Sequence, residues 1–590
     1  MAWDWTRTVD NAICGWTTSA NPAATGLQEH RPIPTATHPK LCLAAALGAL
    51  AVFGTGAMDL TAQARWDLSQ GLQVGSEEER YLRVLQVAGL APDYPWSVRG
   101  FLPGESERLV PTGRHPWEGA FTVPADAEAS PSIGWARAES FLTANSAYPF
   151  GENDGALWAG RGINLAVRGG VVARVGPLYA RFVPEILFSQ NADFDLVPNG
   201  MSGEGRFRDP INPNAIDKPQ RPSDGAFVRV GGGWSGIGAG LGPVAVGFTT
   251  ASQHWGPSIS YPLLLGRNAG GFPHAYVQSS RPLDIGIGRV HGKFIAGGLG
   301  QSDFSPITVE ETRRFVSGAV LVLLPRGIDG LEIGAGRFVQ GIWLEGGIGV
   351  RELLRPFGTG VSTGDPESNP IGENQIAGAF FRWRFSSAGI EVYSEVIRDD
   401  FTRDLRHLFV EPDDLIARVF GIQRVRASSH ERISVIRGEV VSAQVHHSER
   451  GDRFLMPGTV IHPLSRYRHS GVPQGHTHRG QVLASPTAYG GSGFTLGYDR
   501  YDPAGRWSLE LFYRLRMDWR NGQDALAQGG AADEPAADVQ YGASYEKVLF
   551  REGWELAFGV AGIWNLDRNL VAGDDALNLN VSFGVRGLPW

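Results

Sequence analysis

The feature that most constrains this chain of 590 residues is a period-two alternation of apolar and polar side chains. In residues 506–518 the apolar side chains begin at Trp507 and recur at every second position, and charged or polar side chains lie between them. Phe512 is the apolar exception on the polar face. A helix repeats its side chains every 3.6 residues, so this pattern predicts strands with one apolar and one polar face. The same alternation is found in residues 538–545, 554–561 and 577–586.

The alternation alone does not distinguish a soluble sandwich from a membrane barrel, because both have strands with one apolar face. Two further features favour the barrel. The alternating runs are about as long as a tilted strand needs to cross a bilayer, about 9–11 residues. Aromatic side chains also lie at or near the strand ends, where the aromatic girdles of membrane barrels are found. These aromatic residues include Trp507, Trp519, Trp554 and Trp564.

The connections between the expected strands alternate between short and long. Most of the short ones carry Gly, Pro or Asp-Pro, which form tight turns. Short turns on one side and long loops on the other are the asymmetry of outer-membrane barrels, and together the connections predict about 18 strands. An even number places both chain ends on the periplasmic side. The short connections fall near 175–176, 239–241, 286–288, 325–330, 387–388, 427–430, 502–505 and 550–552.

The sequence divides into three parts. Residues 1–64 are expected to be an N-terminal extension and a signal peptide, since Lys40 precedes the apolar run 41–53 and the A-x-A pattern of residues 62–64 follows it. Cleavage there would remove both cysteines. Residues 65–130 are expected to form a short periplasmic helical segment or plug. Residues 131–590 are expected to form the barrel. The predicted fold is therefore all-β, a transmembrane antiparallel β-barrel of about 18 strands with a short N-terminal periplasmic helical segment.

The helical segment has its own start and stop signals. Ser76 and Glu79 form a capping box before a run with Leu82 and Leu85 on one face, and Gly89 follows it. A barrel of about 18 strands has a lumen too wide for its own side chains to fill. The polar faces of the strands therefore line either a water-filled channel or a plugged lumen.

Composition and motifs limit the function classes. The formal charge of −8 argues against a nucleic-acid partner. Gly-x-Ser-x-Gly, His-Glu-x-x-His, phosphate-loop and dinucleotide motifs are absent, so no enzyme activity, cofactor or metal is expected. The acidic run 398–414 leaves one catalytic alternative, a rim enzyme using Asp399, Asp404 and His407. The other interpretation of this run is a salt-bridged loop folded into the barrel mouth.

The long loops hold the candidate binding residues. Trp158 follows the polar run 152–155, and His254 and Trp255 begin another loop. Trp beside polar groups suits a sugar, because the ring stacks on its apolar face while polar groups bind hydroxyls. Packing at the barrel rim is the alternative. The pair His476 and His478 could bind a metal, or could make polar contacts within the loop or to a ligand.

These segments resemble the capsule assembly Wzi family of outer-membrane proteins. The matching pieces occur in the family's order and spacing, and the similarity covers roughly 76–590. The helical segment is short here, and the outer loops are Gly-rich and particular to this chain. The matching pieces are Trp158–Gly162, Gln253–Pro257 with Asn268–Pro273, Arg403–His407 and Gly475–Gly480.

The resemblance implies an outer-membrane protein with a lectin-like role that holds capsular polysaccharide at the cell surface and supports capsule assembly. The expected partners are surface or capsular polysaccharide and outer-membrane lipid, with the protein as a monomer. The alternative is a porin-like channel for sugars or anions, suggested by lumen arginines such as Arg506, Arg514 and Arg586. The expected glycan-binding residues are Trp158, His254, Trp255, Asp404, Arg406, His407, His476, His478 and Arg479.

Overall fold

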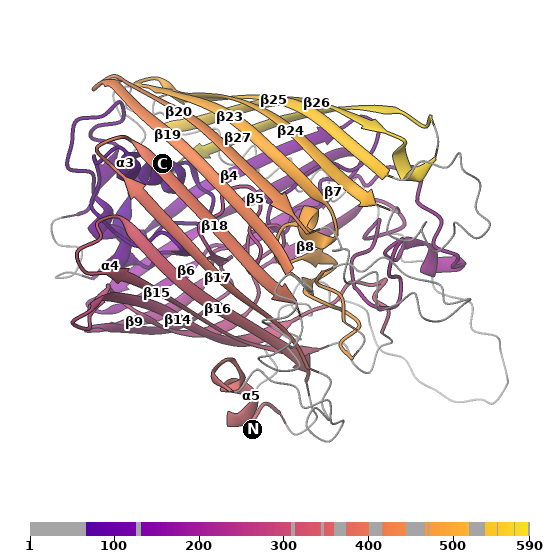
Figure 1. The fold of residues 1–590 in the computed structure, drawn as a ribbon, viewed down its shortest axis with the longest axis horizontal. Coiled ribbons are helices and arrows are strands. Elements are labelled where there is room, and N and C mark those ends of the chain that lie inside the picture. The colour runs from indigo at the N-terminus through magenta and orange to yellow at the C-terminus, as the bar shows by residue number, and fades with distance from the viewer. Residues whose placement is uncertain are drawn as a thin grey trace, which may run out of the picture.

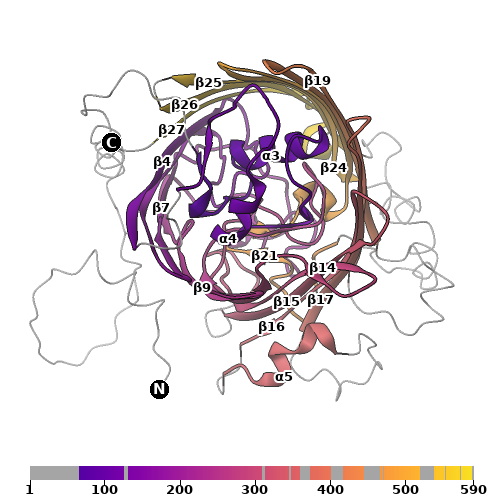
Figure 2. The ribbon, with the colours of Figure 1, turned by 90° about the vertical axis from the view of Figure 1, so that its left-hand side faces the viewer.

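The computed structural model is a closed antiparallel β-barrel with its bore filled by other parts of the chain (Figures 1 and 2). Three of the barrel's strands are each interrupted and appear as two segments, namely β6 with β7, β8 with β9 and β12 with β13. Counting each pair as one strand, the described residues form an 18-stranded barrel. No helix among these residues is long and apolar enough to span a membrane. The structure describes residues 66–124, 131–307, 313–343, 347–358, 373–399, 416–443, 466–469, 471–518, 537–551, 553–571 and 573–587.

The first strand of the barrel pairs with the last, which closes the ring. β27 runs antiparallel to β4, with Asn580 opposite Asn145 and Gly587 opposite Ala138. In a bilayer this closure leaves no strand edge with unpaired backbone groups. The strands are β4 Ser132–Asn145, β5 Gly162–Val175, β6 Leu178–Phe182, β7 Glu185–Ser189, β8 Phe227–Gly231, β9 Gly236–Leu241, β10 Val244–Thr249, β12 His274–Ser279, β13 Leu283–Asp284, β14 Gly288–Leu299, β15 Arg314–Pro325, β16 Leu331–Ile342, β17 Glu373–Phe385, β18 Ile390–Asp399, β19 Ile416–Ser429, β20 Arg432–Ser442, β23 Ser492–Asp502, β24 Gly505–Asp518, β25 Ala537–Arg551, β26 Trp554–Leu566 and β27 Ala576–Gly587.

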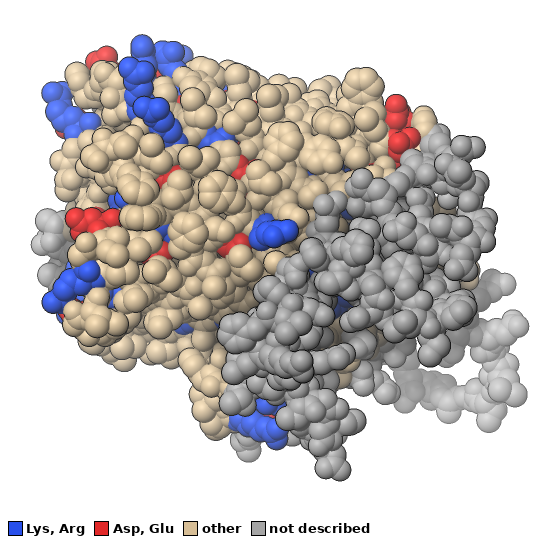
Figure 3. All heavy atoms as spheres, viewed as in Figure 1, with Lys and Arg blue, Asp and Glu red and all other residues tan. Residues whose placement is uncertain are grey.

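The predicted faces of the strands are confirmed. Leu509 and Leu511 on β24 are about half exposed on the outer surface, whereas Arg506 on the same strand is 1% exposed. Figure 3 shows that the side of the barrel in this view is largely uncharged between a few single charged residues, and that many of its Lys and Arg lie toward the left-hand rim. Apolar side chains therefore face lipid, and charged side chains face the bore.

The predicted connections are also confirmed. A short turn separates the strands at or within a few residues of each expected position. Residues 503–504 between β23 and β24 lie within the expected 502–505, whereas the turn expected near 239–241 lies at residues 242–243, because β9 continues to Leu241. These turns share one end of the barrel, here called the turn end, and the long connections share the other, the loop end (Figure 1). In outer-membrane barrels the turn end faces the periplasm and the loop end faces the exterior.

Residues 66–122 form a plug inside the bore, near the turn end (Figure 2). Its main helix, α3 (Glu77–Val87), begins where predicted, with the Ser76 hydroxyl accepting from Glu79 N at 3.3 Å. Gly89 follows the helix with φ +72°. Its other elements are β1 Trp66–Asp67, η1 Leu68–Gln70, β2 Val98–Arg99, α4 Pro103–Ser106, η2 Glu107–Leu109 and β3 Phe121–Thr122.

Ion pairs around the bore hold the plug to the barrel wall. Glu77 pairs with Arg506 at 2.7 Å, and Glu78 pairs with Arg586 at 2.5 Å. On another side of the helix, Arg83 pairs with Glu391 at 3.0 Å. Arg506 and Arg586, which suggested a channel in the sequence, are thus partners of the plug.

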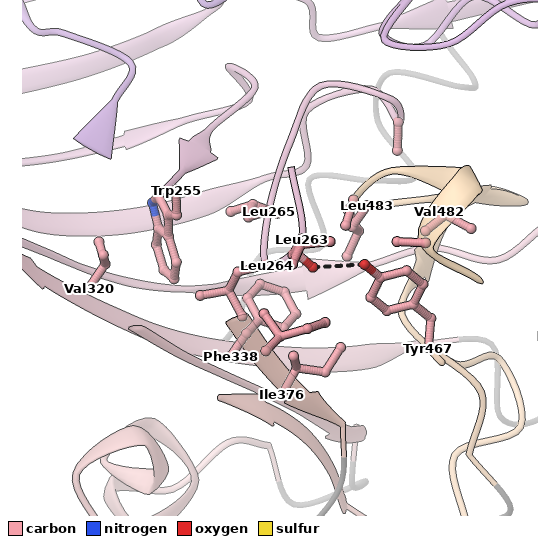
Figure 4. Packing of buried hydrophobic residues seen from close by; sticks show 14 of the residues in the cluster. Trp255, Leu263, Leu264, Leu265, Val320, Phe338, Ile376, Tyr467, Val482 and Leu483 are labelled. Carbon is pink, nitrogen blue, oxygen red and sulfur yellow. Dashed lines mark hydrogen bonds between the residues drawn. The ribbon is translucent and has the colours of Figure 1, made fainter. Parts of the chain in front are cut away.

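The loop 250–273 folds down into the bore from the loop end. It includes β11 (His254–Trp255), which pairs with β2 of the plug. Its leucines pack against Phe338 and Ile376 of the wall, and the Tyr467 hydroxyl donates to the Leu263 carbonyl at 2.9 Å (Figure 4). The other elements in the loops are η3 Gly203–Phe207, α5 Val350–Leu353, η5 Arg355–Phe357, β21 Thr477–His478, β22 Gln481–Val482, η6 Pro486–Tyr489 and η7 Arg568–Leu570.

Candidate functional site

A cavity of about 250 Å³, here called the outer cavity, lies at the loop end of the bore. The connection 146–161 after β4 supplies one side of it, and the wall strand β24 and helix η7 supply another. Both polar and aromatic side chains line it. The residues used below are Tyr148, Phe150, Asp154, Trp158, Tyr489, Arg514, Arg516 and Arg568.

Arginines and aromatic rings alternate along the wall of the outer cavity. The Arg514 guanidinium lies 5.3 Å from the Phe150 ring centre and 4.8 Å from that of Phe512. Phe150 and Phe512 stack with their centres 5.6 Å apart. Phe512, the one apolar residue on the polar face of its strand, therefore has a partner in the bore. In the same way, the Arg568 guanidinium lies over the Tyr148 ring, 5.1 Å from its centre.

Three nitrogen donors of this cavity have no hydrogen-bond partner among the described residues. They are Trp158 Nε1, Arg514 Nε and Arg568 Nε, and each atom is buried. A buried donor without a partner is unfavourable by about 1–3 kcal/mol, so such atoms are rare unless water or a ligand satisfies them. All three donors belong to side chains that line the outer cavity.

The charges around the outer cavity are of both signs. Arg516 pairs with Asp538 at 3.2 Å, and Lys218 pairs with Asp209 at 3.4 Å. Burial, with a further contribution from Arg516, lowers the pKa of Arg568. Burial also raises the pKa of Asp154 to about 6.

His254 and Trp255, predicted from the sequence as binding residues, lie deep in the bore. Trp255 is fully buried and belongs to the large hydrophobic cluster of Figure 4. His254 is 3% exposed and contacts the Arg99 guanidinium of the plug. Burial and this positive charge hold the pKa of His254 well below its usual range. Neither residue lines the outer cavity.

His476 and His478 point to different partners. His476 Nε2 lies 2.8 Å from the Leu264 carbonyl, and burial lowers the pKa of His476 to about 3. His478 Nδ1 accepts from Gly300 N at 3.1 Å. The neighbouring Arg479 has an exposed side chain and a positive φ of 50°. No group of three or more His, Cys, Asp or Glu within the described ranges could hold a metal ion.

The remaining predicted residues, Asp404, Arg406 and His407, lie outside the described residues, as do residues 1–64. Of the predicted residues that the structure describes, Trp158 lines the outer cavity, whereas Trp255 and His478 do not. Ligand binding at each of them stays a prediction.

Sequence reasoning missed Tyr148, Tyr489 and Arg568 at this cavity. Tyr148 lies three residues after the end of β4 and precedes Pro149, which was a usable signal for an aromatic at the rim. The prediction that Leu515 faces outward was wrong. Its side chain is 1% exposed and lines the outer cavity. The register shifts between Leu515 and Met517, and a β-bulge of this kind breaks the alternation of side chains.

No family model and no curated protein matches the sequence. Among solved structures, the chain is similar to Wzi of Escherichia coli, described as an outer membrane protein involved in group 1 capsule assembly and a carbohydrate-binding β-barrel. The TM-score is 0.56 at 14% identity, over 88% of this chain and 99% of that one. The chain has the Wzi barrel fold.

Two further matches are weaker. OprD of Pseudomonas aeruginosa matches with a TM-score of 0.35 at 9% identity, over 78% of this chain and 93% of that one. OccAB2 of Acinetobacter baumannii matches with a TM-score of 0.34 at 9% identity, over 78% of this chain and 98% of that one. The match to Wzi confirms the predicted fold, a closed antiparallel β-barrel.

Proposed function

We propose that this protein is a lectin-like barrel that binds surface or capsular polysaccharide in the outer cavity and supports attachment of the capsule. The observation that carries the proposal is the combination of aromatic faces with the three unpartnered N–H donors at the loop end. Sugar hydroxyls accept hydrogen bonds from such donors, while the apolar face of the ring packs on an aromatic side chain.

Trp158, Tyr148 and Arg568 are the proposed contacts for the glycan. Trp158 has an indole face and an Nε1 donor without a partner among the described residues. Arg568 lies over Tyr148, and its Nε likewise has no partner among them. The proposed role of the buried His254 and Trp255 is indirect, since they fix the loop 250–273 from which Asn268 reaches the same cavity. We assign Asp404, Arg406 and His407 to the same glycan as a further part of the proposal.

The filled bore supports binding over the passage of sugars. The plug and the infolded loops occupy the lumen, and ion pairs to the wall anchor the plug. In this proposal the protein acts as a monomer and catalyses no reaction. The likeness to Wzi, which is described as carbohydrate-binding, supports the same function.

The proposal is tested with polysaccharide purified from the surface of the protein's own host. Retention of this glycan by immobilised protein is compared for wild type, Trp158→Ala and Arg568→Gln. We expect each variant to bind about tenfold more weakly, which corresponds to about 1.4 kcal/mol. Trp564→Ala is the matched control, because Trp564 is 57% exposed on the outer face of β26. Wild-type affinity in both cavity variants would contradict the assignment of the site.

A further inference from the structure

The outer face of the barrel carries basic side chains near the turn end, which the proposed glycan site does not use. Many of the Lys and Arg in Figure 3 lie toward the left-hand rim, the side on which the short turns lie in Figure 1. Five basic side chains on the neighbouring strands from β19 to β25, here called the basic patch, face outward at this end. On β19 they alternate with Gln423 and Val425, which are buried on the bore side. The basic patch consists of Arg424, Arg426 and Arg432, which are exposed, and of Arg500 and Lys547, which are partly exposed.

The strand register places several of these side chains in one row across the wall. Ser434 on β20 lies opposite Arg426 on one neighbouring strand and opposite Arg500 on the other. Arg500 in turn lies opposite Trp507, and Trp507 lies opposite Lys547. Opposing residues in an antiparallel sheet have Cβ atoms about 4.5–5.5 Å apart. The two arginines therefore lie on either side of the Ser434 hydroxyl, at the same level of the barrel.

The apolar, lipid-facing surface begins one row closer to the loop end. In this next row Arg424 is followed across the strands by Ile436, Tyr498 and Leu509. Ile436 is 55% exposed and Leu509 is 48% exposed on the outer surface. The rings of Tyr498 and Trp507 contact each other, with their centres 5.2 Å apart. Aromatic residues at the edge of the apolar band mark the level of the lipid headgroups, so the basic patch lies at the headgroups of the periplasmic leaflet.

The charge of the basic patch is not compensated within the part of the chain that the structure describes, where no ion pair includes any of its five side chains. The nearby carboxylates have other partners. Asp499 and Glu546 are on the same strands but pair with arginines of the bore. At the turns, Glu431 lies 3.9 Å from the neighbouring His430, and Asp502 accepts from a backbone N–H of its own turn. Basic residues at the headgroup level attract anionic lipids.

We propose that the basic patch binds an anionic phospholipid of the periplasmic leaflet, such as phosphatidylglycerol. The lipid phosphate lies over Ser434, between the guanidinium groups of Arg426 and Arg500, whose planar donors match phosphate oxygens. Ser434 Oγ accepts from the Tyr498 hydroxyl at 3.3 Å, so its own O–H can donate to the phosphate. The acyl chains lie along the apolar surface that begins at Ile436. This site does not depend on glycan binding, because it is on the outside of the wall.

The test measures lipid binding to the full chain, purified in a neutral detergent, by native mass spectrometry. Phosphatidylglycerol is compared with phosphatidylethanolamine of the same acyl chains, and we expect wild type to bind the anionic lipid about fivefold or more tightly. Arg426→Gln and Arg500→Gln should each weaken phosphatidylglycerol binding about fivefold, the contribution of one basic residue near an anionic lipid surface. Arg418→Gln is the matched control. Arg418 is also exposed on the outer face of β19, but it lies opposite Ser442 near the loop end, so its loss removes an equal charge away from the patch.

Equal affinity of the wild type for the two lipids would overturn the proposal, and this measurement does not depend on the folding of any variant. Unchanged phosphatidylglycerol binding by the double variant Arg426→Gln, Arg500→Gln would also contradict it. An equal loss of binding in Arg418→Gln would show that the lipid responds to the total charge of the protein, and the assignment of the site would then be wrong.

Discussion

Glu439 on β20 is expected to hold the infolded loop 250–273 in place. Its carboxylate is 3% exposed. One oxygen accepts from Ser258 Oγ at 3.0 Å, Ser260 N at 3.0 Å and Tyr261 N at 2.7 Å. The other accepts from Ile259 N at 2.8 Å and from the Tyr393 hydroxyl at 2.6 Å. A carboxylate suits this position because it has acceptor sites on both oxygens and no donor.

Glu439→Gln keeps the shape of the side chain and removes half of its acceptors. The amide oxygen can still accept from Ser258, Ser260 and Tyr261. The amide nitrogen then faces Ile259 N, and two N–H donors oppose each other without an acceptor between them. Hydrogen bonds to a charged acceptor are worth about 1.5–3 kcal/mol each, against about 0.5–1.5 kcal/mol for neutral pairs. Losing one and weakening the others should destabilise the docked loop by about 3–5 kcal/mol.

The assay is limited proteolysis with trypsin, which can cleave after Arg267 once the loop opens. Since each 1.4 kcal/mol is tenfold, the open population and the cleavage rate should rise about a hundredfold or more. The barrel itself should stay folded, because its backbone pairing does not involve the loop. Glu431→Gln, at an exposed turn residue, is the matched control. Cleavage of Glu439→Gln at the wild-type rate would refute the role given to this carboxylate.

Three further predictions concern stability. Burial raises the pKa of Glu105 in the plug from 4.5 to about 7, so the fold favours its protonated form, and this stabilisation is lost as pH rises from about 4.5 to 7. Glu105→Gln should flatten the decline in the free energy of unfolding between pH 5 and pH 8, by on the order of 3 kcal/mol, and an unchanged slope would contradict this. Leu511→Arg on the lipid-facing surface should destabilise the barrel in vesicles by about 2–4 kcal/mol, whereas Leu511→Phe should not. Gly421→Ala would place Cβ in the Tyr393 ring and should reduce the free energy of unfolding by about 1–3 kcal/mol. Gly562→Ala is the control and should not, because nothing lies within 4 Å of a Cβ there.

Much of the fold could be predicted from the sequence because the bilayer imposes a local rule. Each crossing must place apolar side chains outward at every second residue, and this rule can be seen within a single segment. The strands, their faces and the positions of the short turns follow from it. Leu515 marks where the rule fails, since one bulge at Arg516 is enough to change the alternation.

The candidate site could be predicted only in part. Trp158 and Trp255 look alike in the sequence, each a Trp in a long loop with polar neighbours. The structure has Trp158 at the outer cavity and Trp255 buried against the wall. No local signal distinguishes them, because burial depends on which loop folds into the bore.

By itself the sequence determined that this chain closes into a membrane barrel with a polar lumen and begins its plug with a capped helix at Ser76. The tertiary structure decided which lumen charges are compensated and which are left alone. Arg506 pairs with Glu77, 429 positions earlier in the sequence, whereas among the described residues Arg181 contacts the Trp234 ring and donates to the Gln70 carbonyl. The reason is physical: alternation is a property of neighbouring residues, but the pairing of charges in the bore depends on segments far apart in the chain meeting in a space that only the closed barrel creates.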